Sequence, residues 1–457
     1  MKSRLILVCI CACITGCSSA QQDDSLMVRK IYDESRRTND AYNNLEKLCS
    51  LYPGRMVGSA RLLGAIDYTR KLMATIGADT VYLQSLDGPY WKPGETSVAS
   101  IHSDLKGSRS VHILPLGLSI GTGNKPVTAE VIEVMNFTEL ETLGKEKIQG
   151  KIVFFNRPFP KSVQAGMSGY GMTVDQRTQG ASQAARFGAI AVLVRSVTAS
   201  IDTFPHTGVM QYKDGVDKIP AVAISTIDAE TLSEWLKSDS HTSCSFQTNC
   251  QFLPPAKIYN VIGELWGSEK PHEIITVGGH LDCWYNAAGA QDDGAGCIQS
   301  IDVLRIFRHL HIKPRHTIRA VMFVDEEMTQ TGAKKYAELA VANNEKELAA
   351  IESDRGGFKP VGMGISASDE QFARFLKWEN YFKPFGIESF SKDGEGTDIE
   401  PLEKLGAINC SFIPGPNKYF NFHHSARDNI KAVDPVELEL GSASMAAFIY
   451  LLDTRGF

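Results

Sequence analysis

The chain has 457 residues, of which 43% are hydrophobic, and its formal net charge at pH 7 is −6. This length allows one large hydrophobic core and a second, smaller one, because single cores seldom grow beyond about 250–300 residues. Proteins that bind nucleic acids usually carry a clustered basic excess, so the composition argues against nucleic acid as a partner.

The N-terminus predicts export. Two basic residues precede an apolar run over residues 5–14, which is typical of a secretory signal and too short to remain as a membrane-spanning helix. The run ends in Ile14-Thr15-Gly16-Cys17, which resembles the lipobox of bacterial lipoproteins. The resemblance implies that a signal peptide, 1–16, is removed, that Cys17 is lipidated, and that 17–25 form a tether. The protein would then sit on the periplasmic or cell-surface face of an envelope membrane, held by its lipid alone, with no later segment expected to span the bilayer.

Six cysteines follow Cys17. Cys244 and Cys250 flank a short polar stretch and could form a hairpin disulfide in an oxidising compartment. The other four show no CxxC-type metal spacing, so burial as small apolar residues is the preferred interpretation. These four are Cys49, Cys283, Cys297 and Cys410.

The first part of the chain predicts a charged surface helix, a loop, a second helix that Ser59 caps, and three short strands. The helices are expected over 26–50 and 60–76, and the strands over 81–86, 98–103 and 111–116.

Apolar strands and alanine-rich helices then indicate a compact α+β insertion over 125–255, with Pro254-Pro255 at its exit. Its strands are expected over 130–134, 151–155, 189–194 and 221–224, and its helices over 180–187 and 228–237.

A βαβ series follows the insertion. Strands are expected over 274–277, 317–324, 349–352 and 407–412, and helices over 296–310, 332–342, 371–382 and 436–452. Alternation of this kind predicts an α/β fold with a mostly parallel, mixed sheet sandwiched by helices. The main domain is therefore expected to be discontinuous, formed by 26–124 and 256–457.

Candidate metal ligands follow five successive strands of this series. Because ligands of open α/β sheets bind at the carboxyl ends of strands, we expect these side chains to meet. Imidazole and carboxylate together favour zinc over magnesium or calcium. The set is too large for one tetrahedral ion, so we predict two ions about 3.5–4 Å apart that share a carboxylate. The candidates are His280, Asp292, Glu326, Glu327, Asp354, His423 and His424.

At this point the sequence resembles the co-catalytic di-zinc exopeptidases, which include bacterial aminopeptidases and glutamate carboxypeptidases, and within them the carboxypeptidase Q group. Each motif alone has an ordinary structural explanation, such as a capping aspartate or a solvated helix start. Their order and completeness carry the resemblance. The motifs are Gly54-Arg55, Gly58-Ser59, Gly278-Gly279-His280-Leu281-Asp282, Asp292-Asp293-Gly294-Ala295-Gly296, Glu326-Glu327, Glu352-Ser353-Asp354, Gly396-Thr397-Asp398 and His423-His424-Ser425.

The resemblance implies a phosphorylase/hydrolase-like main domain and two zinc ions. His280 and Asp354 would hold one ion, Glu327 and His424 the other, and Asp292 would bridge them. Glu326 would be the general base.

Two further roles follow from the position of a residue in these motifs. Asp282 would orient the imidazole of His280. His423 stands where some relatives carry tyrosine, and could stabilise the oxyanion as a hydrogen-bond donor. Cys283 departs from the serine common after this motif.

The insertion resembles a protease-associated domain in its Val194-Arg195-Ser196 and Pro205-His206-Thr207-Gly208 segments. This resemblance implies that Arg195, Ser196 and His206 reach the substrate. Asp398 is a further candidate for substrate binding. The same group suggests a homodimer.

The residues leave the activity open between several functions. A carboxypeptidase or dipeptidase, favoured by the resemblance, needs a cation for the free carboxylate of a short peptide, and an aminopeptidase needs an acid for the free amine. An inactive binding lipoprotein or a different hydrolase could also be built on the same scaffold. The candidate cations are Arg195, Arg355 and Arg427, and the candidate acids are Asp325, Glu352 and Asp393.

Overall fold

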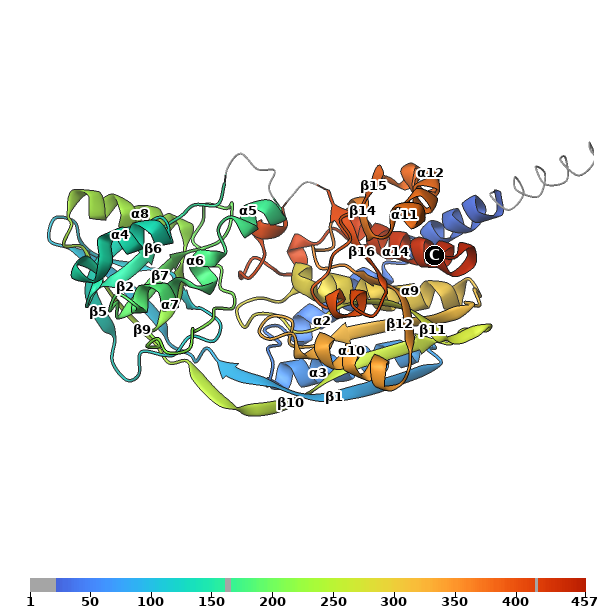
Figure 1. Cartoon of the computed structure of the whole chain (residues 1–457), viewed down its shortest axis with the longest axis horizontal. Coiled ribbons are helices and arrows are strands. Elements are labelled where there is room, and N and C mark those ends of the chain that lie inside the picture. The colour runs from blue at the N-terminus through green and yellow to red at the C-terminus, as the bar shows by residue number, and fades with distance from the viewer. Residues whose placement is uncertain (1–21, 161–165, 416–417) are drawn as a thin grey trace, which may run out of the picture.

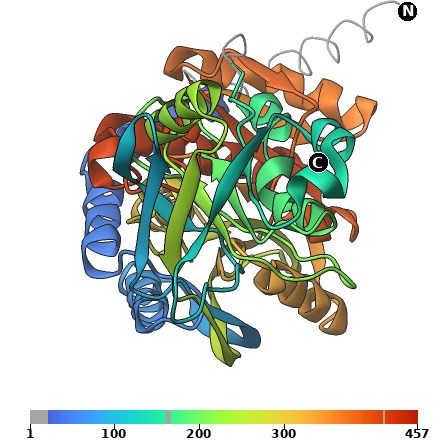
Figure 2. The same ribbon diagram turned by 90° about the vertical axis from the view of Figure 1, so that its left-hand side faces the viewer.

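The computed structural model describes residues 22–160, 166–415 and 418–457, so the predicted signal and Cys17 lie outside the described residues. The chain forms two lobes, which lie next to each other along the horizontal axis of Figure 1, and Figure 2 views the molecule from its left-hand end. Each lobe is built on an eight-stranded sheet. We call residues 22–96 and 251–457 the main lobe and residues 97–250 the insert lobe. The insert lobe lies at one end of the molecule, beyond the loops of the main lobe (Figure 1).

The main-lobe sheet has the strand order β1-β10-β12-β11-β13-β16-β14-β15. Its four central strands, β12, β11, β13 and β16, are parallel. On one side β10 runs antiparallel to β12 and to β1, and on the other β14 runs antiparallel to β16 and parallel to β15. This confirms the predicted mixed α/β architecture. The strands are β1 Thr80–Lys92, β10 Gln251–Leu265, β11 Lys270–His280, β12 His316–Phe323, β13 Lys346–Glu352, β14 Pro360–Ser366, β15 Ser389–Ser391 and β16 Ile408–Pro414.

Helices cover both faces of this sheet. On one face, α2, α9 and α14 pack together into the largest core, and on the other α10 and α13 cover a smaller one. Helix α14 is long and apolar enough to cross a membrane, contrary to expectation, but most of it is buried in the core. Its apolar surface faces protein. The helices are α2 Asp40–Leu51, α3 Ala60–Thr75, α9 Ala295–His309, α10 Thr331–Ala342, α11 Asp369–Phe375, α12 Glu379–Phe382, α13 Glu400–Glu403 and α14 Pro435–Arg455.

The insert lobe has its own sheet, with the order β3-β2-β9-β5-β6-β7-β8-β4, and a core on each face. Neighbouring side chains of β6, Phe154 and Phe155, point to opposite faces and join different cores. The elements are β2 Ser97–Ser103, β3 Gly107–Val111, β4 Ile113–Pro115, β5 Val127–Val134, α4 Phe137–Ile148, β6 Ile152–Phe155, α5 Met167–Gly171, α6 Asp175–Thr178, α7 Gly180–Ala185, β7 Ala191–Arg195, β8 Ala221–Ile224, α8 Thr226–Ser238 and β9 Ser243–Thr248.

The structure moves both predicted boundaries of the insertion. Strands β2, β3 and β4 belong to the insert sheet, so this lobe begins at Ser97 and not at residue 125. Pro254 and Pro255 lie inside β10, which pairs with β1 of the main lobe, and not at an exit. They lie opposite the register shift between Gly88 and Tyr90. Because the regular hydrogen-bond ladder is interrupted there, the missing backbone N–H groups of the two prolines are tolerated.

The N-terminal prediction also needs correction. Residues 22–35 are already helical, so the segment predicted as a tether is part of a helix from residue 22 onward. Asp24 forms an ion pair with Arg455 at 2.6 Å, which attaches this helix to the end of α14. The single helix predicted over 26–50 is two helices, because the chain turns before Asp40, where the Thr38 hydroxyl donates to the Asp40 carboxylate.

The possible disulfide between Cys244 and Cys250 is absent, since both cysteines are free. Cys244 lies in β9 and Cys250 lies just beyond its end, so an extended strand and not a hairpin separates them. Six residues of strand span about 20 Å, far more than a disulfide allows. Cys283 is buried at 1% exposure, which fits its interpretation as a packing residue.

Candidate metal centre

The predicted ligand residues converge at one edge of the main-lobe sheet. His280 is the last residue of β11, Asp292 lies in a short π-helical turn over Ala290–Gly294, and Asp354 follows β13. Glu327 follows β12, and His424 follows β16 through a longer loop. Parallel strands end at the same edge of a sheet, which is why side chains so distant in sequence meet here.

Asp292 lies between two clusters. Its Oδ1 is 3.1 Å from Nε2 of His280, which is also 3.5 Å from Oδ1 of Asp354. Its Oδ2 is 3.4 Å from Nε2 of His424, which is 3.1 Å from Oε2 of Glu327. Each oxygen of one carboxylate therefore faces a different histidine and a different second carboxylate.

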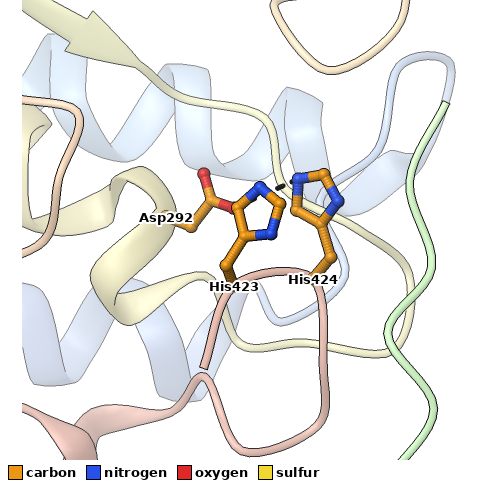
Figure 3. Close-up of side chains that lie close together, drawn as sticks. All are labelled: Asp292, His423 and His424. Carbon is orange, nitrogen blue, oxygen red and sulfur yellow. Dashed lines mark ion pairs between the residues drawn. The ribbon is translucent and has the colours of Figure 1, made fainter. Parts of the chain in front are cut away.

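His423 joins the second cluster. Figure 3 shows its imidazole beside that of His424, with Asp292 close to both. The two rings stack with centroids 3.4 Å apart, and Nε2 of His423 is 4.0 Å from Oδ2 of Asp292. Asp292, His423 and His424 can each offer a ligand atom to one ion, as can His280, Asp292 and Asp354.

The unpaired atoms of the centre fit a bound cation. Nδ1 of His280 donates to the backbone carbonyl of Asp282 at 3.1 Å, so that in the neutral imidazole Nε2 carries a lone pair that faces two carboxylates. Among the described residues, Nε2 of His280 and Oε1 of Glu327 are buried and have no hydrogen-bond partner. A divalent metal would satisfy both atoms and separate the oxygens that otherwise repel one another.

The charges of the centre lead to the same conclusion. Burial raises the pKa of Glu326 to about 8, with Asp354 adding to the effect and His280 opposing it. Burial likewise raises the pKa of Glu327 well above its usual value. Burial would lower the pKa of His280, but Asp292 and Asp354 outweigh it and raise that pKa. Without bound cations, the surroundings thus favour the protonated forms of Glu326 and Glu327. Bound cations would favour the ionised carboxylates instead.

Asp282 acts differently from the prediction. Its backbone carbonyl, and not its carboxylate, accepts the Nδ1 proton of His280. The carboxylate accepts the backbone N–H groups of Glu326 at 3.3 Å and Glu327 at 3.4 Å. It therefore fixes the turn that presents both glutamates.

Asp428 and Arg55 hold the loop that carries Asp292. The Asp428 carboxylate accepts from the backbone N–H groups of Ala290, Gln291 and Asp292 at 3.0, 2.7 and 3.3 Å. Arg55, fully buried, donates to three backbone carbonyls around the same loop. These acceptors are Leu281, Ala288 at 2.6 Å and Gly289 at 2.8 Å. The sequence marks Arg55 within a motif, but its partners are known only from the fold.

A cavity of about 630 Å³ opens over the centre and is lined by both lobes. The main lobe contributes Glu326 and Tyr419, whose hydroxyl donates to Asp354 at 3.3 Å. The insert lobe contributes Tyr170 and Arg177, which the sequence analysis did not identify. Both come from short helices next to the cavity, and no local sequence signal distinguishes them.

The insert residues predicted to touch substrate do not line this cavity. Arg195 lines a separate cavity of the insert lobe and donates to Asn156 at 3.2 Å and Glu230 at 2.9 Å. The Ser196 hydroxyl donates to the Ile224 carbonyl at 2.8 Å. His206 is buried at 2% exposure, and its Nδ1 donates to the His423 carbonyl at 2.7 Å.

Asp398 is buried behind the cavity wall, where its backbone N–H donates to Glu352 at 3.0 Å. Of the predicted cations, Arg355 lines the cavity and pairs with Glu395, whereas Arg427 pairs with Asp202 at 2.8 Å.

Comparison with known proteins identifies the family. The model of Peptidase family M28 matches residues 260–449, which include the whole centre. Carboxypeptidase Q of Mus musculus is 34% identical over 414 residues, covering 91% of this chain and 86% of that protein. The chain belongs to peptidase family M28.

Two other M28 relatives extend over nearly the whole chain. Carboxypeptidase Q of Xenopus laevis is 35% identical over 434 residues, covering 95% of this chain and 90% of that protein. The crystal structure of a peptidase M28 precursor from Shewanella amazonensis SB2B superposes with a TM-score of 0.90 at 29% identity, covering 94% of this chain and 97% of that one. The family predicted from the motifs is thus confirmed.

We expect removal of bound metal with a chelator to lower the Tm of this M28 protein, and re-addition to restore it. A ligand present at about 100 times its Kd stabilises the native state by about 2.7 kcal/mol, and its loss leaves the buried carboxylates uncompensated. Calorimetry of chelated and reloaded protein measures the shift, with an Asp292→Ala variant as the control that should not respond. An unchanged Tm in protein shown by elemental analysis to have lost metal would contradict the centre.

Proposed function

We propose that this M28 peptidase is a two-zinc exopeptidase that hydrolyses dipeptides or short peptides from the carboxyl end. The observation that carries the proposal is the position of Asp292, which directs one oxygen to each of two histidine–carboxylate clusters. One ion would be held by His280, Asp354 and Asp292, and the other by Glu327, His424 and Asp292. Mixed imidazole and carboxylate ligands favour zinc.

When bound, the two ions would polarise the scissile carbonyl and lower the pKa of the attacking water. Glu326 lines the cavity beside the ligand residue Glu327. In this proposal its carboxylate takes a proton from the water and delivers it to the nitrogen of the leaving amine. Glu327 cannot serve both as a metal ligand and as the base, because a carboxylate that coordinates a metal ion is no longer free to accept the proton.

His423 is proposed to stabilise the oxyanion of the tetrahedral intermediate. Burial lowers the pKa of His423 to about 3, with Arg177 adding to the effect and Asp292 opposing it, so the imidazole is neutral at pH 7 and keeps one N–H donor. Its ring lies over that of His424 at the cavity. A donor fixed at this place would act as the charge develops.

Arg177 favours the carboxypeptidase direction over the aminopeptidase direction. It lines the cavity, is 3% exposed, and has the partners Tyr170 at 2.6 Å, the Thr207 carbonyl at 3.5 Å and Nδ1 of His424 at 3.5 Å, none of which is a carboxylate. Arg355, by contrast, already pairs with Glu395. A buried guanidinium without a carboxylate partner among the described residues suits the free carboxylate of a peptide.

Export and lipid attachment through Cys17 are part of the proposal, as is the assignment of the insert lobe as a protease-associated domain. The separate sheet and cores of that lobe support it as an independent unit. Homodimer formation stays a prediction.

A panel of short peptides with free or blocked ends tests the proposed function. We expect cleavage of peptides with a free carboxyl end, none of their carboxyl-terminal amides, and none after chelation.

Glu326→Gln should lower kcat by about 10²–10⁴-fold while both metals stay bound, because it removes the proton acceptor and no ligand. Glu400→Gln, which alters an exposed glutamate of the same cavity, is the control. Mass spectrometry and elemental analysis provide the readouts. Wild-type rates in Glu326→Gln would refute the base, metal binding without turnover would favour a binding protein, and a requirement for a free amine would favour an aminopeptidase.

We expect His423→Ala to lower kcat by about 10²-fold, the effect of losing one oxyanion donor, with KM changed little. Steady-state kinetics and metal content, measured together, separate the two possible roles of this residue. Unchanged kcat would rule out the oxyanion role, and loss of one metal would identify His423 as a ligand.

Lipid attachment is tested by metabolic labelling with a radioactive fatty acid in a bacterial host. The wild-type protein should carry the label and sediment with membranes, and Cys17→Ala should do neither, because the thiol that accepts the lipid is gone. An unlabelled wild-type protein would overturn this part of the proposal.

A further inference from the structure

We propose that the insert lobe builds part of the metal centre: its loop over Pro205–Gly208 positions His424, so that one of the two metal ions depends on contact between the lobes while the other does not. This inference rests on the proposed function. It assigns positioning roles to residues of the insert lobe that lie outside the cavity.

The two histidines of the centre are oriented from different lobes. Nδ1 of His280 donates to the carbonyl of Asp282, two residues along the same main-lobe segment. Nδ1 of His424 donates to the carbonyl of Thr207 in the insert lobe at 3.2 Å. Such an outer partner fixes the tautomer and direction of a ligand imidazole and raises its basicity. For His424, therefore, this support comes from across the lobe boundary.

The loop holds the backbone of both tandem histidines as well. The Thr207 N–H donates to the His424 carbonyl at 3.1 Å, so that Thr207 both donates to and accepts from one residue. Nδ1 of His206 donates to the His423 carbonyl at 2.7 Å. A backbone carbonyl can only accept, so the proton of this bond lies on Nδ1 of His206.

His424 needs this support because of its backbone. Its φ is +62°, a left-handed conformation that residues with a side chain rarely adopt and that persists only where the surroundings hold it. From the main lobe, Asn286 donates to the His424 carbonyl at 3.1 Å. The other hydrogen bonds to this residue's carbonyl and imidazole described above come from the insert lobe.

The loop is itself fixed to the insert-lobe sheet. The Thr207 hydroxyl donates to the carbonyl of Pro115 at the end of β4, at 2.6 Å. The His206 N–H donates to the Ser196 hydroxyl at 2.9 Å, and Ser196 donates onward to Ile224 at the end of β8. These hydrogen bonds fix the loop, and through it His424, relative to the insert-lobe sheet. Ser196 and His206 therefore have a structural role next to the centre.

Gly208 lets the loop approach this closely. A Cβ atom at this position would lie 2.6 Å from Nδ1 of His424 and 2.5 Å from the guanidinium of Arg177. The residue also has a φ of +135°, which favours glycine. Any larger residue would push the loop away from His424 or displace the imidazole.

The test is a two-site metal titration of the full-length protein. Apo-protein with His206→Leu is titrated with Zn²⁺ in a competing metal buffer, and bound metal is quantified. We expect one ion to bind about 10–100-fold more weakly, the usual effect of losing outer support for a ligand, and the other to bind as in the wild type. His206→Gln, which keeps a donor, should recover part of the loss.

Two further variants keep the result interpretable. Gly208→Ala should weaken the same ion although it removes no side-chain contact, and unchanged affinity for the other ion shows that the variant is folded. Thr198→Val is the matched control, because Thr198 donates across the lobes to the carbonyl of Phe420, in the same segment as the histidines, at 2.6 Å. It should leave both affinities unchanged.

The outcomes separate this inference from the function on which it rests. Equal weakening of both ions, no weakening in His206→Leu and Gly208→Ala, or the same loss in Thr198→Val would overturn the inference. Fewer than two ions in the wild-type protein would instead contradict the two-zinc proposal.

Discussion

The concentration of buried carboxylates around Asp292 is the constraint on which the rest of the site depends. Asp292, Glu327 and Asp354 lie beside His280 and His424 within a few ångströms. Charges of one sign cannot share a poorly solvated space unless opposite charges separate them. A site of this composition is therefore built for cations, and its chemistry follows from the ions that it holds.

The fold assembles this charge by simple geometry and then holds the loops that carry it through hydrogen bonds to their backbone. Parallel strands bring their carboxyl ends to one edge, and each strand exit adds one or two side chains. Backbone N–H groups and carbonyls do much of the positioning, through Asp428, Asp282 and Arg55. These hydrogen bonds hold the turns that carry Asp292, Glu326 and Glu327.

The two lobes contribute unequally to the site. The main lobe supplies the candidate ligands and Glu326, the proposed base, whereas the insert lobe lines the cavity with Tyr170 and Arg177 and contacts His424 through Thr207. Arg177, the cation proposed to bind the substrate carboxylate, and Thr207, a hydrogen-bond partner of His424, both come from the insert lobe, so both lobes form the candidate site.

The sequence by itself determined the α/β class, nearly every strand exit and the identity of the residues at the centre. Alternating strands and helices are local patterns, and the rule that strand ends share an edge converts them into a site. Only the tertiary structure decided where the insert lobe begins and that the Asp282 carboxylate accepts a hydrogen bond from the backbone at Glu326. It also decided that Arg177, and not Arg195, lines the cavity. Such features depend on contacts between segments far apart in the chain. Periodicity and spacing describe a residue's neighbours along the chain, and they carry no information on which distant group it will meet.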